Sequence, residues 1–194
     1  MSPAPIIAAQ GASFVYPGRP AAIGPFDTQI NAGEIHLFSG RSGCGKSTLA
    51  RMLSGLIPHL YRGRFGGRVL VAGRDSTDAP LWELTARVGL VTQNPPAQLL
   101  ASTVRDEIVF GLENLGLPAR EIEARVADAL AAFGLEALAA RDPHTLSGGE
   151  QQKLVLAAIA ARRTEALILD EPLSMLDAAS ARNFIGDLDR LRLN

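Results

Sequence analysis

The sequence has few of the features that mark secreted or membrane-spanning proteins. It contains one cysteine, Cys44, in 194 residues, so no disulfide can form within the chain. The longest apolar runs, such as 130–133 and 154–161, fall far short of the roughly 20 residues that a membrane-spanning helix needs. The first ten residues lack the basic segment and cleavage pattern of a secretory leader. These absences predict a soluble cytoplasmic protein.

The chain also lacks an excess of charge of either sign. Its 19 basic and 20 acidic side chains give a formal net charge of −1, which is unlike the basic balance of a general nucleic-acid binder. Lysine is scarce, because only Lys46 and Lys153 accompany 17 arginines. Hydrophobic residues make up 47% of the sequence, so the chain can bury a sizeable core and is not a disordered segment.

The spacing of apolar residues predicts an α/β fold with an inserted helical lobe. Runs bounded by glycine and proline predict strands, and longer periodic stretches predict helices. The expected core comprises residues 1–94 and 164–194, and the expected lobe comprises residues 95–163. The predicted strands are 6–16, 26–31, 34–39, 68–72, 87–92 and 166–169. The predicted helices are 47–57, ended by Pro58, then 103–133 with a break at 116–118, 147–163 and 178–193.

One glycine-rich segment has the spacing of a phosphate-binding loop. Residues 40–47 match G-x-x-x-x-G-K-[ST] between a predicted strand and a predicted helix. Glycines let the backbone wrap around a polyphosphate, and the helix start adds a positive dipole end. Lys46 is expected to reach the β- and γ-phosphates, and Ser47 to bind Mg²⁺. The predicted nucleotide-binding residues are Gly40, Arg41, Ser42, Gly43, Cys44, Gly45, Lys46, Ser47 and Thr48.

The single cysteine lies inside this loop. A thiol at a helix N-terminus can be activated, but a small spacer is the simpler interpretation of Cys44. Under either interpretation we expect a thiol reagent to block nucleotide binding and ATP to protect against it.

Two carboxylates follow the apolar run 166–169. In an α/β sheet the carboxyl ends of the strands line the ligand crevice. Asp170 can hold Mg²⁺ there through its water shell, and Glu171 can polarise a water molecule for in-line attack on a γ-phosphate. Alone, the pair could be a solvated turn. Together with the phosphate-binding loop it predicts a site that hydrolyses ATP.

A third motif, Leu-Ser-Gly-Gly-Glu-Gln-Gln at 146–152, opens another predicted helix. With it, the sequence resembles the ATPase subunits of ABC transporters over nearly the whole chain. Ser147 and the amides of Gly148 and Gly149 predict a second anion site at the helix start. The resemblance implies that this site closes over the γ-phosphate of ATP on an opposing subunit in a head-to-tail dimer, so hydrolysis depends on dimerisation.

The resemblance also implies roles for residues outside these motifs, and a P-loop core sheet with an antiparallel N-terminal β subdomain. Tyr16 matches the aromatic side chain that stacks on adenine. Gln93 matches the glutamine that senses Mg²⁺ and the attacking water, and residues 174–177 match the segment that crosses the dimer interface. The implied catalytic residues are Glu171, Gln93 and Lys46, and the implied Mg²⁺ ligands are Ser47, Gln93 and Asp170.

Several further stretches resemble energy-coupling-factor and cobalt or nickel importers within this family. They are 14–18, 55–58, the Q-N-P-x-x-Q stretch at 93–100, and 103–111. This resemblance implies a peripheral subunit on the cytoplasmic face of the membrane. It implies integral membrane partners, one of which captures a vitamin or metal ion, and a second ATPase subunit, either identical or related.

Two departures from the family pattern stand out. Glu150 replaces a more usual glutamine, which places a charge near the predicted anion site. Only 23 residues follow Glu171, too few for the further strand and the switch histidine that relatives carry. The sequence therefore predicts a truncated chain with weak or absent hydrolysis by itself. All three histidines lie upstream, and His144 is interpreted as a loop residue without chemistry.

Two other functions compete with an importer motor. One is a non-transport ABC ATPase acting on DNA or ribosomes, but the roughly 100 residues between Ser47 and Leu146 contain no sustained heptads and no second cassette is visible. The other is a different P-loop enzyme such as a nucleotide kinase, which the segment at 146–150 argues against. We expect no nucleic-acid partner.

Overall fold

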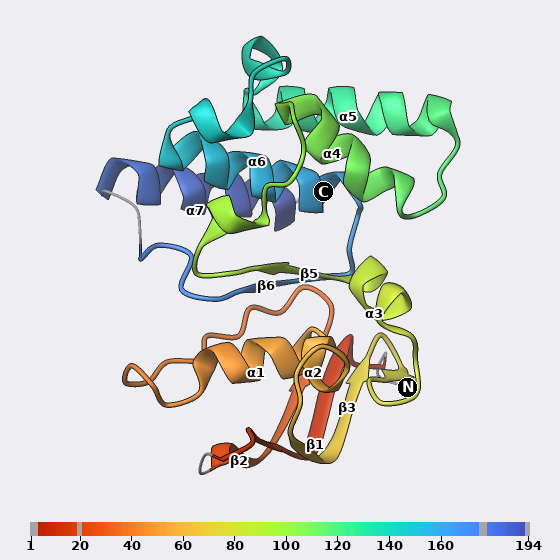
Figure 1. Ribbon diagram of the computed structural model, residues 1–194, viewed down its shortest axis with the longest axis vertical. Helices are drawn as coiled ribbons and strands as arrows, with labels where there is room; N and C mark the ends of the chain where they lie inside the picture. The colour runs from red at the N-terminus through yellow and green to blue at the C-terminus, as the bar shows by residue number, and fades with distance from the viewer. Residues whose placement is uncertain (1–3, 19–20, 175–177, 193–194) are drawn as a thin grey trace. The chain divides into compact units, whose positions relative to one another are not determined.

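The computed structural model describes residues 4–18, 21–174 and 178–192, which fall into two compact units (Figure 1). The first unit comprises residues up to 90 together with 164–170. Its main element is an antiparallel sheet with the strand order β2-β1-β3-β4. The strands are β1 (Ile7–Val15), β2 (Ala21–Ile30), β3 (Arg64–Val71) and β4 (Arg74–Asp75). The predicted antiparallel N-terminal subdomain is confirmed.

Strand β1 lies at the centre of this sheet, where Ile7 pairs with Ile30 on one side and Val71 on the other. The register shifts near Gly67, which has a φ of +72°. A Cβ added at Gly67 would lie 2.2 Å from the carbonyl oxygen of Gly11, so only glycine allows the two strands to approach so closely here.

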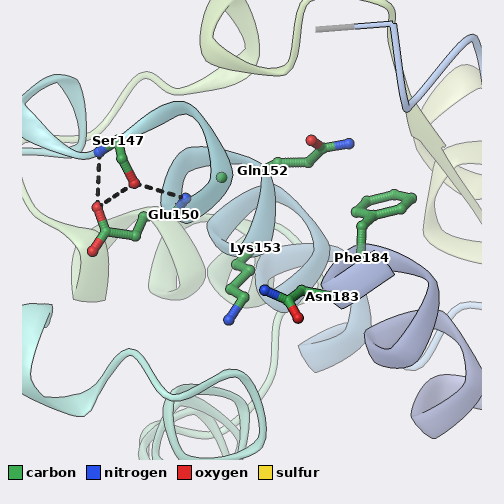
Figure 2. Close-up of a pocket in the computed structure, with 7 residues that line it drawn as sticks. Ser147, Glu150, Gln152, Lys153, Asn183 and Phe184 are labelled. Atoms are coloured by element: carbon green, nitrogen blue, oxygen red, sulfur yellow. Dashed lines mark hydrogen bonds between the residues drawn. The ribbon is translucent and has the colours of Figure 1, made fainter. Parts of the chain in front are cut away.

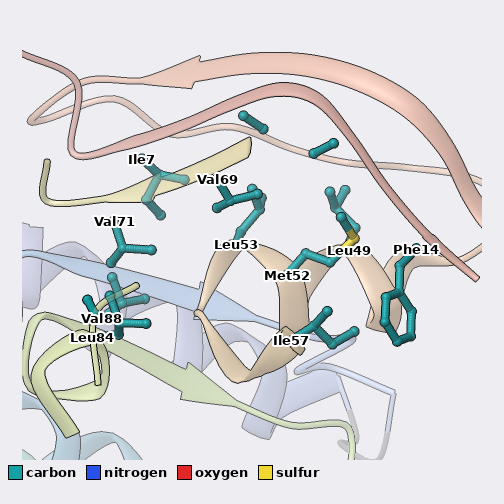
Figure 3. Packing of buried hydrophobic residues seen from close by; sticks show 13 residues of the cluster. Ile7, Phe14, Leu49, Met52, Leu53, Ile57, Val69, Val71, Leu84 and Val88 are labelled. Carbon is teal, nitrogen blue, oxygen red and sulfur yellow. The ribbon is translucent and has the colours of Figure 1, made fainter. Parts of the chain in front are cut away.

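Helix α1 (Lys46–Leu53) packs against the sheet and closes the core of the first unit (Figure 3). The predicted extension of this helix to residue 57 is wrong, because α1 ends at Leu53 and a short helix α2 (Leu56–His59) follows. The break falls at Gly55, whose φ of +79° is left-handed, and Pro58 lies inside α2. The glycine, rather than the proline, ends the longer helix.

The predicted strand at 34–39 is also wrong, since this segment lies outside both sheets that the described residues form. Its apolar side chains gain little burial, because Ile35 and Leu37 are 75% and 90% exposed. Strand geometry needs a neighbouring ladder to pair the backbone, and apolar alternation alone does not supply one. Glu34 in this segment makes polar contacts, and hydrogen bonds from Asn31, with a smaller contribution from His36, lower its pKa to about 2.

A second, two-stranded sheet is formed by β5 (Val88–Val91) and β6 (Ala166–Leu169), and all of its residues except Val91 belong to the first unit. Helix α3 (Leu81–Arg87) leads into β5. Arg87 ties the two strands together, because its carbonyl accepts the N–H of Glu165 at 2.7 Å and its guanidinium donates to the Glu165 carboxylate at 2.6 Å. Strand β6 lies against α1.

The second unit comprises residues 91–163 and 171–194, and its described part is mainly helical. Helix α6 is its centre, and α4, α5 and α7 each pack against it (Figure 1). Apolar residues of α6, such as Leu154 and Leu156, are fully buried there. Among the helices that the structure describes, none combines the length and apolar character that crossing a membrane requires. The elements are η1 (Pro95–Gln98), α4 (Val104–Glu113), α5 (Ala119–Phe133), η2 (Glu136–Leu138), η3 (Pro143–Thr145), α6 (Gly148–Ala161) and α7 (Ala178–Arg192).

Candidate functional site

The predicted phosphate-binding loop runs directly into the N-terminus of α1. Gly43 and Gly45 have φ angles of +79° and +105°, a left-handed backbone that other residues rarely adopt. Lys46 folds back over the loop, and its Nζ donates to the carbonyl oxygens of Gly40 and Arg41 at 3.1 and 3.4 Å. The loop thus has the backbone shape that its glycines predict, and the ammonium of Lys46 is held against the carbonyl groups at its start.

Tyr16 is anchored beside this helix. Its hydroxyl lies 3.5 Å from Thr48 Oγ1 and accepts a hydrogen bond from Arg51 at 3.3 Å. Its ring meets Phe14 edge to face, with 4.8 Å between the centroids. The contacts fix the aromatic ring next to the first turn of α1, within the same unit as the phosphate-binding loop.

Asp170 follows β6 and is only 8% exposed. Because β6 lies against α1, the strand that carries Asp170 packs on the helix that begins with Lys46 and Ser47. A buried carboxylate is costly without a positive partner, so a cation is a favourable neighbour for this side chain. Hydroxyl and carboxylate oxygens are donors of the kind that Mg²⁺ takes.

Gln93 and Glu171 meet in the second unit although 78 residues separate them. Gln93 Nε2 donates to Glu171 Oε2 at 3.3 Å. The backbone of Glu171 has a φ of +49°, a strained conformation for a residue with a side chain. It is held because Ser174 donates both its N–H and its hydroxyl to the Glu171 carbonyl, at 3.1 and 2.9 Å. The side-chain amide of Gln93 and the carboxylate of Glu171 are thereby held next to each other.

The segment that connects Gln93 to α4 is fixed by two side chains. Gln98 Oε1 accepts the N–H and hydroxyl of Thr92 at 2.9 and 3.1 Å. Glu107, which is buried, accepts the N–H groups of Leu100 and Ala101, both at 2.8 Å. Leu100 itself is 76% exposed. The sequence analysis missed these structural roles, although Gln98 and Glu107 both lie in the importer-like stretches it identified.

Ser147 caps helix α6 through a reciprocal contact with Glu150 (Figure 2). The Ser147 N–H and hydroxyl donate to Glu150 Oε2 at 2.8 and 2.6 Å, and the Glu150 N–H donates to Ser147 Oγ at 3.4 Å. The two hydrogen bonds from Ser147 lower the pKa of Glu150, so this carboxylate is charged at neutral pH. A cavity of about 160 Å³ adjoins the cap, lined by Ser147, Gly149, Glu150, Gln152, Lys153, Asn183 and Phe184.

Gly148 is the first residue of α6, and nothing in its own surroundings requires a glycine. A Cβ added there would meet nothing within 4 Å, and its φ is not left-handed. A residue that neither packing nor backbone conformation explains is consistent with an external molecule approaching the helix start.

The predicted site residues therefore fall into two groups. The first unit holds Tyr16, the loop at 40–47, Thr48 and Asp170, and the second holds Gln93, Glu171 and Ser147–Gly149. Of the predicted interface segment 174–177, only Ser174 lies among the described residues. His144 is exposed in η3, and its N–H donates to Asp142 at 2.8 Å.

The ABC transporter family matches residues 23–174, well over half of the chain, so the chain belongs to this family. It is an ATP-binding domain of the ABC ATPase class, as predicted, and the alternative of a nucleotide kinase is excluded. In particular, it is 43% identical over 197 residues to the energy-coupling factor transporter ATP-binding protein EcfA1 of Symbiobacterium thermophilum. That match covers 96% of this chain and 67% of the relative.

This chain covers a smaller share of some other relatives. A putative ABC transporter ATP-binding protein of Methanosarcina acetivorans is 45% identical over 159 residues, covering 82% of this chain but 26% of the relative. The structure of cbiO1 from Clostridium perfringens, part of the ABC transporter complex cbiONQ, has a TM-score of 0.84 at 28% identity. It covers 98% of this chain and 74% of that one. The chain thus spans only part of the length of the relatives it matches.

Proposed function

We propose that this chain is the ATP-hydrolysing motor of an importer of the energy-coupling-factor type, and that it works as a dimer with a second ATPase subunit. The observation that carries the hydrolytic part is the contact between Gln93 and Glu171. A carboxylate held by an amide beside a strained backbone is suited to orient a water molecule.

The nucleotide is bound by the first unit in this proposal. Adenine stacks on Tyr16, and the triphosphate lies in the loop at 40–47. There Lys46 exchanges its two carbonyl partners for phosphate oxygens. The reaction needs little covalent help, so binding and orientation supply most of the rate.

Ser47 and Asp170 would hold the Mg²⁺ that accompanies the nucleotide, and the resemblance to ABC ATPases assigns the amide oxygen of Gln93 to the same ion. These are all oxygen donors, as the ion prefers. When bound, it supplies charge neutralisation on the phosphate oxygens. Glu171 orients the attacking water and takes up its proton, and Gln93 holds that carboxylate in place.

The second subunit contributes its equivalent of Ser147, Gly148 and Gly149 to close the site. The open space at Gly148 and the exposure of Ser147 support this assignment. Neither nucleotide is fully enclosed until both subunits meet, which makes hydrolysis depend on dimerisation.

The transport assignment is supported by the EcfA1 relatives and by the fixed segment that presents Leu100. In this proposal that segment and the helical unit contact an integral membrane subunit on its cytoplasmic face. The cargo, a vitamin or a metal ion, is recognised by another membrane protein.

Replacing Glu171 with glutamine tests the hydrolytic assignment. In the intact protein, the Glu171→Gln variant is expected to keep nucleotide affinity, to dimerise with ATP, and to lose at least about 100-fold in turnover, the usual contribution of a positioned base. Equilibrium ATP binding and steady-state phosphate release are measured in parallel. Glu136→Gln, which removes an exposed carboxylate in η2, is the matched control and should behave like the parent. Turnover of Glu171→Gln at the parent rate would remove Glu171 from the reaction.

Purification of the intact protein from membranes distinguishes transport from the alternative of a DNA- or ribosome-associated ABC ATPase. We expect integral membrane subunits to co-purify with the protein in mild detergent. Recovery with ribosomes or DNA, and without membrane subunits, would favour the alternative.

A further inference from the structure

Ser147 has a single hydroxyl proton, and in this structure that proton is engaged in a hydrogen bond to Glu150. The hydroxyl donates to Glu150 Oε2 at 2.6 Å, and the same oxygen accepts the Ser147 N–H at 2.8 Å. One side chain therefore occupies both donors of the residue that opens α6 (Figure 2). A hydroxyl cannot donate to a carboxylate and to a phosphate at the same time.

The carboxylate also brings charge to this place. Its hydrogen bonds with Ser147 keep the pKa of Glu150 low, and Arg141 and Lys153 add a smaller lowering. An ionised group here attracts the helix dipole but repels an anion that approaches the same hydroxyl. The cap of α6 and a bound phosphate are thus competitors for Ser147.

We infer that Glu150 restrains Ser147 in the free subunit and must release it when the nucleotide of the opposing subunit arrives. Glu150 is then a positioning residue that sets how much ATP is needed to close the dimer. This inference rests on the proposed function, because it deepens the role of the α6 start in a shared nucleotide site.

A second partner for the released carboxylate lies one helical turn away. Lys153 is three residues beyond Glu150 on α6, and both line the cavity that adjoins the cap. Side chains at this spacing face one another on a helix. Lys153 can therefore pair with the Glu150 carboxylate when Ser147 turns to the phosphate. Glu150 thus has two alternative partners, Ser147 in the free subunit and Lys153 in the closed dimer.

The test measures the ATP concentration that half-maximally dimerises the intact protein with Mg²⁺, by light scattering, in a Glu171→Gln background that prevents turnover. Adding Glu150→Gln should lower this concentration about fivefold, because a charge-assisted hydrogen bond is replaced by a neutral one. The substituted amide can still close the capping box, so thermal unfolding should stay near that of the parent. Glu136→Gln is the control and should leave the concentration unchanged.

Lys153 provides the second arm of the test. Lys153→Met should raise the ATP concentration about twofold, the size of a helical pair interaction, and should have no effect once Glu150→Gln is present. An unchanged or higher concentration for Glu150→Gln, or a Lys153→Met effect that persists without the carboxylate, would overturn the inference while leaving the proposed function intact. Failure of every variant to dimerise at any ATP concentration would overturn the proposed function and this inference with it.

Discussion

At the scale of single residues, the site is made by side chains whose partners lie close in sequence and by one pair whose partners do not. Lys46 and Ser147 find their partners within six residues, and such local contacts can be anticipated from spacing. The S-x-x-E spacing at 147–150 is typical of a capping box, which the sequence analysis did not predict because it considered only the replacement of glutamine by Glu150. The contact of Gln93 with Glu171 joins positions 78 residues apart, so spacing could not predict it, and the resemblance assigned both residues to catalysis without predicting that they touch.

Cys44 gives the clearest residue-scale prediction. Its side chain is exposed, and its Sγ lies so near Gly40 that a Cβ there would come within 2.7 Å of it. N-ethylmaleimide at this position would fill the space that a polyphosphate needs, so we expect modification to reduce ATP affinity at least tenfold. Bound ATP should slow the modification, and Cys44→Ser should be insensitive to the reagent. Full ATP binding after stoichiometric labelling would contradict the prediction.

At the scale of elements, the sequence predicted helices better than strand pairing. Strand β6 has the predicted bounds, and α6 and α7 lie within two residues of the predicted ends. These elements follow from local periodicity and caps. Residues 34–39 show the limit, because a strand also needs a partner from elsewhere in the chain. Gly55 shows another limit, since a Cβ there would lie 2.7 Å from Leu84, a close approach that local spacing does not predict.

Glu107 supports a prediction at this scale about the segment that connects Gln93 to α4. Its buried carboxylate accepts two backbone N–H groups, so Glu107→Ala leaves both without this acceptor. We expect a loss of about 1–3 kcal/mol in the free energy of unfolding, measured with urea, and faster hydrogen exchange at Leu100 and Ala101. Glu113→Ala on the exposed side of α4 is the control. Unchanged exchange at both amides would show that Glu107 does not fix the segment.

At the scale of the whole molecule, the two units divide the proposed work. The first holds the groups that bind the nucleotide, and the second holds Gln93, Glu171 and the start of α6. The family match and the α/β fold confirm what the three motifs predicted together. Each motif alone had a simple structural explanation, and only their order along one chain specified the class.

Leu100 provides a prediction at this largest scale, because its large apolar side chain is exposed to water and does not contribute to the core. If the segment before α4 contacts a membrane subunit, Leu100→Asp should strongly reduce co-purification of that subunit, since a charge would be buried at the contact. ATP binding should stay at the parent level, because the substitution lies outside the phosphate-binding loop. Leu60→Asp alters a leucine that is 63% exposed in the first unit and is the matched control. Equal recovery of membrane subunits with both variants would place the contact elsewhere, whereas loss with Leu100→Asp alone would link the fixed segment to transport.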